Sequence, residues 1–294
     1  MDTPKNSTTA LPVTSSKSIL ITGCSSGIGR CVAQGLHARG YRVFATARKA
    51  ADVADLQSQG LESLLLDLDD PASIHTAVDE ILTRTGGTLD ALFNNAGYGQ
   101  PGAVEDLRRD VIRAQFETNL FGTLELTNRI IPIMRAQGQG RIIQNSSLLG
   151  LVALPYRGAY NASKFALEGL TDTLRLELAG SGIHVSLIEP GPIKSRFRAN
   201  AHAAYHRNIH PEPSAHRIRY QGLEKRLVKI GPAAPFTLPP EAVLKKVIHA
   251  LESPRPKMRY YVTLPSYFFA LIRRLLPGRA LDWVLQQISR GENR

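Results

Sequence analysis

Short apolar runs alternate with longer segments of helical spacing over most of this chain. The runs are nearly continuous in apolar residues, as are parallel strands buried on both faces. They span Ser18–Thr22, Arg42–Ala47, Ser63–Asp67, Ala91–Asn95, Arg141–Asn145 and His184–Glu189. Helical periodicity fills the intervals, for example in Pro71–Thr85 and Ala159–Leu178. The repeated order of strand, helix and strand predicts an α/β fold with a doubly wound parallel sheet.

The predicted sheet belongs to one domain, because no linker, repeat or low-complexity stretch divides residues 17–252. Beyond it, residues 253–294 are basic and amphipathic. They include one more apolar run, Arg259–Thr263, which predicts an edge strand. Two helical patterns broken at Pro277-Gly278 follow. We therefore expect a single domain with a C-terminal helical extension.

The composition is that of an ordinary soluble globular protein. Of 294 residues, 43% are hydrophobic and 21% are charged, which excludes collagen-like, coiled-coil and wholly disordered chains. Cys24 and Cys31 are too few for a disulfide framework, so we expect free thiols in a reducing compartment. Residues 1–16 are polar and are expected to form a flexible tail. With no signal-peptide pattern and no apolar stretch of membrane-spanning length, we predict a cytoplasmic protein.

The net charge of +11 is concentrated late in the chain. Residues 194–229 carry +7 and residues 253–294 carry +6, so the remainder is slightly acidic. Because the basicity is local, the sequence argues against nucleic acid as the partner. A local anion or a membrane surface stays open as a partner.

A glycine-rich turn follows the first predicted strand and leads into a helix. Phosphates need main-chain N–H donors at close approach and a helix N-terminus that faces them. The turn offers both, so we expect a dinucleotide to bind at Gly23, Ser25, Ser26, Gly27, Ile28 and Gly29. The alternative is an ordinary glycine-rich turn.

The ends of the second and third strands bear on which dinucleotide binds. No acidic residue ends the second strand, where Arg48 and Lys49 stand instead. Arg48 can pair with a 2′-phosphate, which favours NADP over NAD; a solvated surface pair is the alternative. Asp67 can accept a hydrogen bond from the adenine amino group while Leu68 packs nearby. Asp67 can equally cap the helix that starts at Pro71.

Four polar residues suggest acid–base chemistry. Tyr160 and Lys164 lie four apart on one predicted helix and therefore share a face. A nearby cation lowers the pKa of a phenol, which makes Tyr160 usable for proton transfer near neutral pH. Ser147 follows a predicted strand and is placed to donate to a substrate carbonyl. Asn119 interrupts a helical stretch, and its carbonyl is a candidate for holding a water near Lys164.

Together these motifs resemble the classical short-chain dehydrogenase/reductase family. The order and spacing match over about residues 17–252 and rest on the glycine turn, Asn95 in Asn-Asn-Ala-Gly, Asn119, Ser147, Tyr160 and Lys164. The resemblance implies a Rossmann-type three-layer sandwich. It also implies a dimer or tetramer, assembled through the helices that carry Asn119 and Tyr160.

The resemblance implies a role for each matching residue. Tyr160 exchanges a proton with the substrate oxygen, and Lys164 binds the nicotinamide ribose and lowers the Tyr160 pKa. Ser147 polarises the carbonyl, and Asn119 anchors a proton-relay water. The remaining matches contact the cofactor: Asn95 and, in the Pro-Gly segment after the sixth strand, Ile193 and Ser195, where the family more often has threonine.

Further strings, among them SLIEPGPI and RRLLPGRALD, resemble a bacterial branch of this family, the YbbO-type oxidoreductases. That branch implies NADPH-dependent reduction of a lipophilic aldehyde or ketone. Two alternatives stay open: oxidation of a hydroxysteroid-like or retinol-like alcohol, and a regulator that senses NADP(H) without turnover.

Two late segments leave further questions open. Residues 196–238 are expected to form the substrate lid, in which His202, His206 and His210 recur at helical spacing. Because no acidic or cysteine ligand accompanies them, we expect a solvated lid face and no metal site. The amphipathic residues 265–290 either lie on the inner face of an anionic membrane or pack on the domain or a second subunit.

Overall fold

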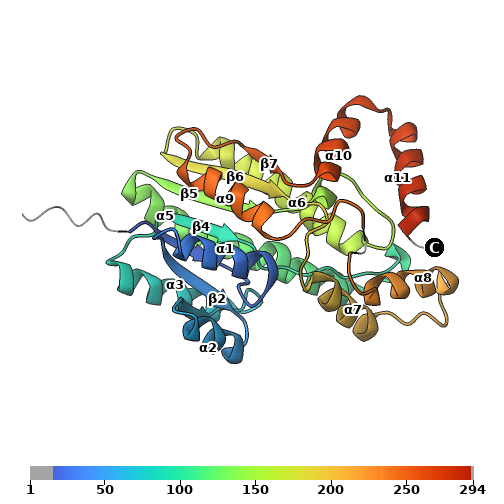
Figure 1. Ribbon diagram of the computed structural model, residues 1–294, viewed down its shortest axis with the longest axis horizontal. Helices are drawn as coiled ribbons and strands as arrows, with labels where there is room; N and C mark the ends of the chain where they lie inside the picture. The colour runs from blue at the N-terminus through green and yellow to red at the C-terminus, as the bar shows by residue number, and fades with distance from the viewer. Residues whose placement is uncertain (1–15, 233, 293–294) are drawn as a thin grey trace, which may run out of the picture.

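The computed structural model describes residues 16–232 and 234–292. Its strands form one sheet in the order β3-β2-β1-β4-β5-β6-β7, and every neighbouring pair is parallel (Figure 1). The strands are β1 (Ser18–Ile21), β2 (Arg42–Ala47), β3 (Glu62–Leu65), β4 (Ala91–Asn94), β5 (Gly140–Asn145), β6 (Ile183–Glu189) and β7 (Arg259–Tyr261). The predicted α/β fold with a doubly wound parallel sheet is confirmed.

Helices connect the strands and cover both faces of the sheet. They are α1 (Gly27–His37), α2 (Ala50–Ser58), α3 (Pro71–Thr85), α4 (Arg109–Phe116), α5 (Gly122–Gln137), α6 (Gly158–Glu177), α7 (Phe197–Asn208), α8 (Arg217–Val228), α9 (Glu241–Glu252), α10 (Leu264–Leu275) and α11 (Gly278–Glu292). Three short turns lie between them: two 3-10 turns, η1 (Val104–Asp106) and η3 (Leu148–Gly150), and a π turn, η2 (Glu117–Phe121).

The core is divided by the sheet into two apolar layers. On one face, α1, α2 and α9 pack through residues such as Leu36 and Val247. On the other face, α3, α5 and α6 pack through residues such as Ile74 and Ile130. Strand side chains alternate between the two layers, which explains why the strands read as continuous apolar runs.

The start of α3 illustrates how local sequence sets an element boundary. The Asp70 carboxylate accepts a hydrogen bond from the Ala72 main-chain N–H at 3.0 Å, and Pro71 occupies the first helical position. Asp70 is therefore the cap. The interpretation of Asp67 as the capping residue is wrong, which leaves its carboxylate accepting from the Asp69 main-chain N–H.

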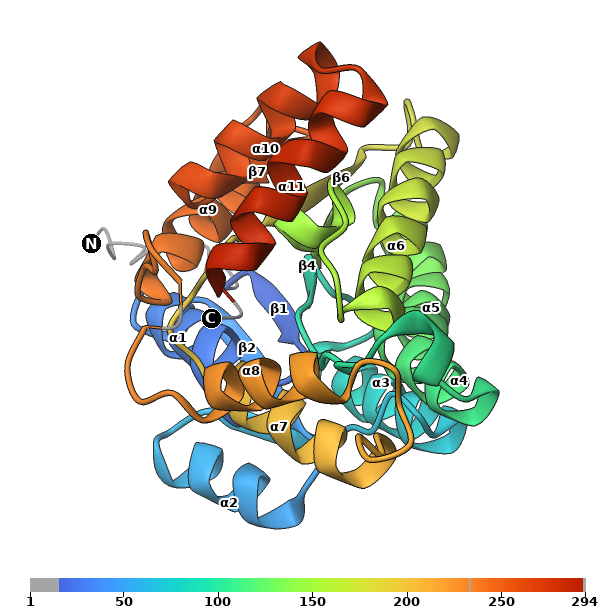
Figure 2. The same ribbon diagram turned by 90° about the vertical axis from the view of Figure 1, so that its right-hand side faces the viewer.

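Two helical pairs gather at the carboxyl end of the sheet. Figure 2 shows α7 and α8 on one side of the ends of β1 and β4, and the α10–α11 hairpin on the other. The break between α10 and α11 comes at Leu276-Pro277, next to the predicted position. Within the described residues no helix has the length and apolarity to cross a bilayer. The tail predicted for residues 1–16 lies outside the described part of the chain, apart from Ser16.

Candidate active site

The expected site residues lie where the parallel strands end. The glycine turn follows β1, Arg48 follows β2, Asp67 and Leu68 follow β3, Asn95 follows β4, Ser147 follows β5, and Ile193 and Ser195 follow β6. Because carboxyl ends of parallel strands meet at one edge, the fold collects these residues from across the sequence. This edge is where open α/β sheets bind ligands.

The glycine turn is closed by contacts that leave no room for side chains. Gly23 and Gly27 have positive φ of 71° and 59°, which glycine adopts without strain. A Cβ on Gly29 would lie 2.3 Å from the Gly23 carbonyl oxygen, and one on Gly27 would lie 2.9 Å from Ser195 Cβ. Ser26 directly precedes α1, and its side chain makes no capping hydrogen bond to the helix. The helix N-terminus and the Ser26 hydroxyl are thus available to a phosphate.

Asn95 holds the turn in place from inside the protein. Its Nδ2 donates to the Thr22 carbonyl at 2.9 Å and to the Gly23 carbonyl at 3.2 Å. Its Oδ1 accepts from Asn145 Nδ2 at 2.9 Å. Asn95 therefore links the glycine turn to the end of β5. Its polar atoms serve the shape of the cofactor edge.

The residues after β2 and β3 present different chemistry. Arg48 is exposed, and within the described residues no hydrogen bond or ion pair occupies its guanidinium. Leu68 is buried, and its carbonyl oxygen packs so closely on Gly122 that a Cβ there would lie 1.9 Å away. The edge thus offers an exposed guanidinium after β2 and a buried leucine after β3.

Ser147 lies beside Tyr160, near enough for its hydroxyl to affect the pKa of the phenol. Ser147 is held by the turn η3, where its Oγ accepts a hydrogen bond from the Leu149 main-chain N–H at 3.1 Å. Burial raises the pKa of Tyr160 to about 12, and the nearby Ser147 hydroxyl opposes that rise. In the protein chain by itself, burial therefore outweighs the lowering of the Tyr160 pKa that Lys164 is expected to provide.

Lys164 lies behind Tyr160 and faces the end of β5. Its Nζ donates to the Asn145 carbonyl at 2.7 Å and lies 5.8 Å from the Tyr160 ring centroid. Because the ammonium makes its hydrogen bond to Asn145 and not to the phenol, burial of the phenol dominates. Burial also lowers the pKa of Lys164 to about 8, against the attraction of Glu168.

Asn119 lies in the π turn η2 that joins α4 to α5. Such turns are frequent at functional sites. Its Nδ2 donates to the Tyr98 carbonyl at 3.0 Å and to Ser163 Oγ at 3.1 Å, and its Oδ1 accepts from the Tyr98 main-chain N–H at 3.1 Å. Ser163 in turn donates to the Tyr160 carbonyl at 2.9 Å. Asn119 thus fixes the first turn of the helix that carries the phenol and the ammonium.

A buried ionic cluster beneath Lys164 was not anticipated from the sequence. Arg259 on β7 forms ion pairs with Glu168, Glu189 and Asp172. Burial and the Glu168 charge raise the pKa of Glu189 to about 8, while Arg259 opposes the rise. The spacing of Glu168, four residues after Lys164 on α6, is the one local signal that the cluster offers. A cleft of about 520 Å³ opens beside it, away from Ser147.

The segment expected to form the lid begins beside Tyr160. The Phe197 ring meets the Tyr160 ring edge-on, with centroids 5.3 Å apart. Ile193 pairs with Leu238 in a parallel bridge, so both ends of the lid are joined where it leaves the domain. Tyr205 on α7 and Tyr220 on α8 are almost completely buried in a separate apolar cluster beneath the lid. Helices α7 and α8 therefore pack on each other and on the domain through this cluster, while the loops around them are largely exposed.

The three lid histidines do not share one face. Helix α7 ends at Asn208, so His210 lies beyond it and outside the group formed by His202 and His206. The expectation that no acidic ligand accompanies these histidines is wrong, because α8 brings Glu224 to them. Sequence spacing could not reveal this, since Glu224 comes from another helix.

Comparison with known proteins agrees with this geometry. The family model described as short chain dehydrogenase matches residues 17–206. The chain is 46% identical to the uncharacterized oxidoreductase YbbO of Escherichia coli, covering 92% of this chain and 94% of that protein. It is 34% identical to an NADPH-dependent 3-dehydrocapnine reductase of Ornithobacterium rhinotracheale, covering 90% and 94%. A Burkholderia phymatum short chain dehydrogenase/reductase solved with NAD has 26% identity and a TM-score of 0.74, covering 92% and 95%.

Proposed function

Because the chain belongs to the short-chain dehydrogenase/reductase family of NAD(P)-dependent oxidoreductases, we propose that it uses NADPH to reduce a lipophilic aldehyde or ketone to the alcohol. The observation that carries the proposal is the joint placement of Ser147, Tyr160 and Lys164 beside the glycine turn. Asn119 completes the set by positioning α6.

The described residues fit a dinucleotide. The tight contacts of Gly27 and Gly29 make a cradle that any side chain would fill, at an uncapped helix N-terminus. Bound NADPH supplies the hydride. Arg48 is free to pair with a 2′-phosphate, and no carboxylate ends β2 to repel it. The similar NADPH-dependent reductase agrees with this preference. Since a structural relative was solved with NAD, the preference rests on Arg48.

The proton comes from Tyr160. With its pKa raised to about 12, the phenol is protonated at neutral pH and can donate from Oη to the carbonyl oxygen. Ser147 lies beside the same phenol and would donate to that oxygen as negative charge develops. Lys164, buried and fixed on the Asn145 carbonyl, stabilises the phenolate that remains.

Apolar residues next to Tyr160 and Ser147 support a lipophilic substrate. The Phe197 ring packs edge-on against the Tyr160 ring. The segment after Ser147 contributes Leu148, Val152 and Leu154 to an apolar cluster, which the C-terminal hairpin completes with Phe269 and Leu285. We therefore expect an apolar group beside the carbonyl that reaches Tyr160.

Absorbance at 340 nm tests the proposal directly. The full chain is mixed with NADPH or NADH and a panel of short to long aldehydes, retinal and ketosteroids. We expect the rate of NADPH consumption to increase with the carbon-chain length of the aldehyde. In Tyr160→Phe this rate should fall by roughly 10²–10⁴-fold. Binding of NADPH, measured by fluorescence, should be retained in that variant. Turnover unchanged in Tyr160→Phe would refute the assigned proton donor.

The same panel separates the alternatives. Oxidation of hydroxysteroids or retinol with NADP, faster than any reduction, would favour the alcohol dehydrogenase. Tight NADPH binding without turnover across the panel would favour a regulator that senses NADP(H).

The C-terminal hairpin carries a second apolar face, and we propose that it contacts an anionic membrane surface. While Phe269 packs inward, α10 exposes a stripe at helical spacing: Leu264, Tyr267, Phe268, Leu271 and Leu275. Arg273, Arg274 and Arg279 are exposed beside it. An apolar stripe flanked by arginines complements an anionic bilayer in both polarity and charge.

Vesicle flotation distinguishes a membrane from a second subunit as the occupant of this stripe. We expect the protein to float with anionic vesicles and not with zwitterionic ones, and Phe268→Asp with Leu271→Asp to abolish flotation. Val228→Asp changes a comparably exposed apolar residue at the end of α8, outside the stripe, and is the control. A stripe variant that converts a dimer to a monomer without affecting flotation would show that the stripe is a subunit interface.

We also propose that the protein forms a homo-oligomer, through surfaces other than the stripe on α10. Phe121 in η2, and Leu170 and Leu176 on α6, are exposed apolar residues on the helices expected to pair. Sedimentation velocity of the wild type and of Leu176→Asp tests this. A monomeric wild type would contradict it.

A further inference from the structure

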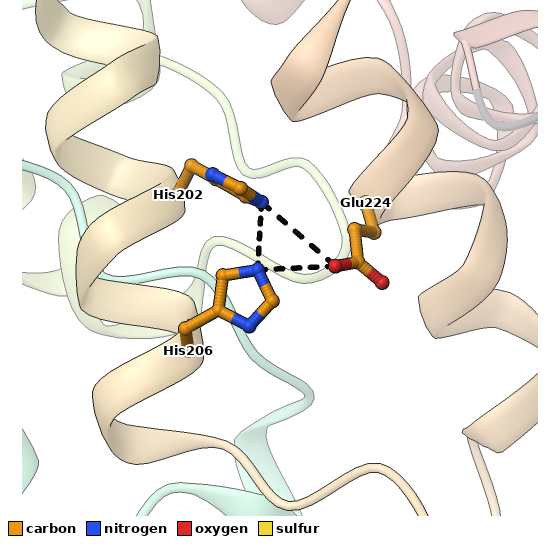
Figure 3. A group of neighbouring side chains, drawn as sticks. All are labelled: His202, His206 and Glu224. Atoms are coloured by element: carbon orange, nitrogen blue, oxygen red, sulfur yellow. Dashed lines mark hydrogen bonds and ion pairs between the residues drawn. The ribbon is translucent and has the colours of Figure 1, made fainter.

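The two helices of the lid hold a group of potential metal ligands that plays no part in the proposed reduction. Helix α7 carries His202 and His206 one turn apart, and α8 carries Glu224 opposite them (Figure 3). The Nε2 atoms of the two histidines are 2.8 Å apart. Glu224 Oε1 lies 3.0 Å from His206 Nε2 and 3.8 Å from His202 Nε2.

We propose that His202, His206 and Glu224 bind a divalent transition metal ion, zinc above all, and that this ion links α7 to α8. Two imidazoles and a carboxylate form a set that zinc uses with its fourth position left to water. Ligands at about 2.0–2.1 Å from a tetrahedral zinc are separated by roughly 3.3 Å. The three observed separations bracket that value.

Proton counting supports a cation at the centre of this group. A hydrogen on His206 Nε2 can be donated to Glu224 or to His202, but not to both. If His202 instead donates to His206, a nitrogen lone pair faces the carboxylate at 3.0 Å. A metal ion removes the conflict, because all three atoms then direct lone pairs at it.

The ligand chemistry selects the class of ion. Magnesium and calcium prefer sets made of oxygen atoms, whereas imidazole suits zinc, copper and nickel. The side chains are partly exposed, with 28% for His202, 54% for His206 and 42% for Glu224, so an ion can enter from solvent. Since α7 begins at Phe197, against Tyr160, an ion here would fasten the lid beside the active site.

Calorimetric titration of zinc chloride into the metal-free full chain near neutral pH tests the site. We expect one ion per chain. Mutating a residue that only hydrogen-bonds to a metal ligand typically weakens metal binding by ~10–100-fold. Loss of a ligand itself, in His206→Ala or Glu224→Gln, should weaken zinc binding by more than that. His210→Ala removes a histidine of the same segment outside the group and should bind as the wild type does.

Thermal unfolding gives a second readout that does not depend on turnover. Zinc should raise the midpoint of the wild type and of His210→Ala, and should not raise that of His206→Ala. Cys31 is the competing ligand, since its thiol contacts Glu241. Binding that persists in His206→Ala and disappears in Cys31→Ser, or no binding by the wild type, would overturn the proposal.

Discussion

The glycine turn and the ionic cluster around Arg259 are built in opposite ways. The turn is shaped mainly by close main-chain contacts: the Cys24 N–H donates to the Thr46 carbonyl on β2, and Gly29 packs on Gly23. The cluster is made by side chains far apart in sequence, with Arg259 reaching Glu168 and Glu189. The turn leaves its main chain open to close approach, whereas the cluster holds α6 to β6 and β7.

Removing the shared cation of the cluster should have the largest effect. Arg259→Ala leaves two buried carboxylates without their partner, which costs about 3–5 kcal/mol in the free energy of unfolding. Urea unfolding followed by circular dichroism measures it. Arg255→Ala, an exposed arginine just before β7, is the control and should change stability little. Equal stability of the two variants would show that the cluster is not a structural support.

Replacing Arg48, the exposed cation after β2, should affect nucleotide binding and not folding. Arg48→Ala should weaken NADPH by the roughly 1.5–3 kcal/mol of a charged hydrogen bond, about 10–100-fold, and leave NADH nearly unchanged. Fluorescence titration with both nucleotides measures it. Lys49→Ala is the neighbouring control. A parallel loss for NADPH and NADH would contradict the assignment of Arg48 to the 2′-phosphate.

A methyl group added at Gly29 tests how tightly the main chain of the glycine turn is packed. Gly29→Ala should cost roughly 1–3 kcal/mol in the free energy of unfolding, because its Cβ would collide with the Gly23 carbonyl, and should impair binding of either nucleotide. Gly169→Ala on α6 meets no atom within 4 Å and is the matched control. That variant should gain up to about 1 kcal/mol from helix propensity. Unchanged stability of Gly29→Ala would mean that the turn opens more easily than its contacts indicate.

The smallest effect is expected from pH. Lys164, with its pKa lowered to about 8, is charged below that pH and loses its proton above it. Reduction should therefore have a kcat/KM that is flat between pH 6 and 7 and falls about tenfold per unit beyond pH 8. Stopped-flow absorbance across the pH range measures it, with circular dichroism to confirm that the fold persists. A profile that stays flat to pH 10 would remove Lys164 as the controlling group.

These two regions also differ in how far the sequence predicted them. The glycine turn, Arg48, Ser147, Tyr160 and Lys164 could be located by spacing, because each lies at a strand end or on one helix face. The ionic cluster escaped prediction because ion pairs between β7 and α6 have no local period. The pKa of Tyr160 escaped for a related reason: burial depends on what the chain packs against the ring.

The sequence by itself determined the order of strands and helices, the glycine turn after β1 and the placing of Tyr160 and Lys164 on one helix face. These features depend on patterns that span only a few residues: the spacing of apolar residues, the position of glycines and the helical repeat. Such patterns are visible in the linear sequence. Only the tertiary structure decided that Glu224 joins His202 and His206 while His210 does not. It also decided that α10 has an inner and an outer apolar face. Such contacts form when whole helices and strands pack against one another. Packing brings together residues that are far apart in the sequence, and no regular spacing announces which of them will meet.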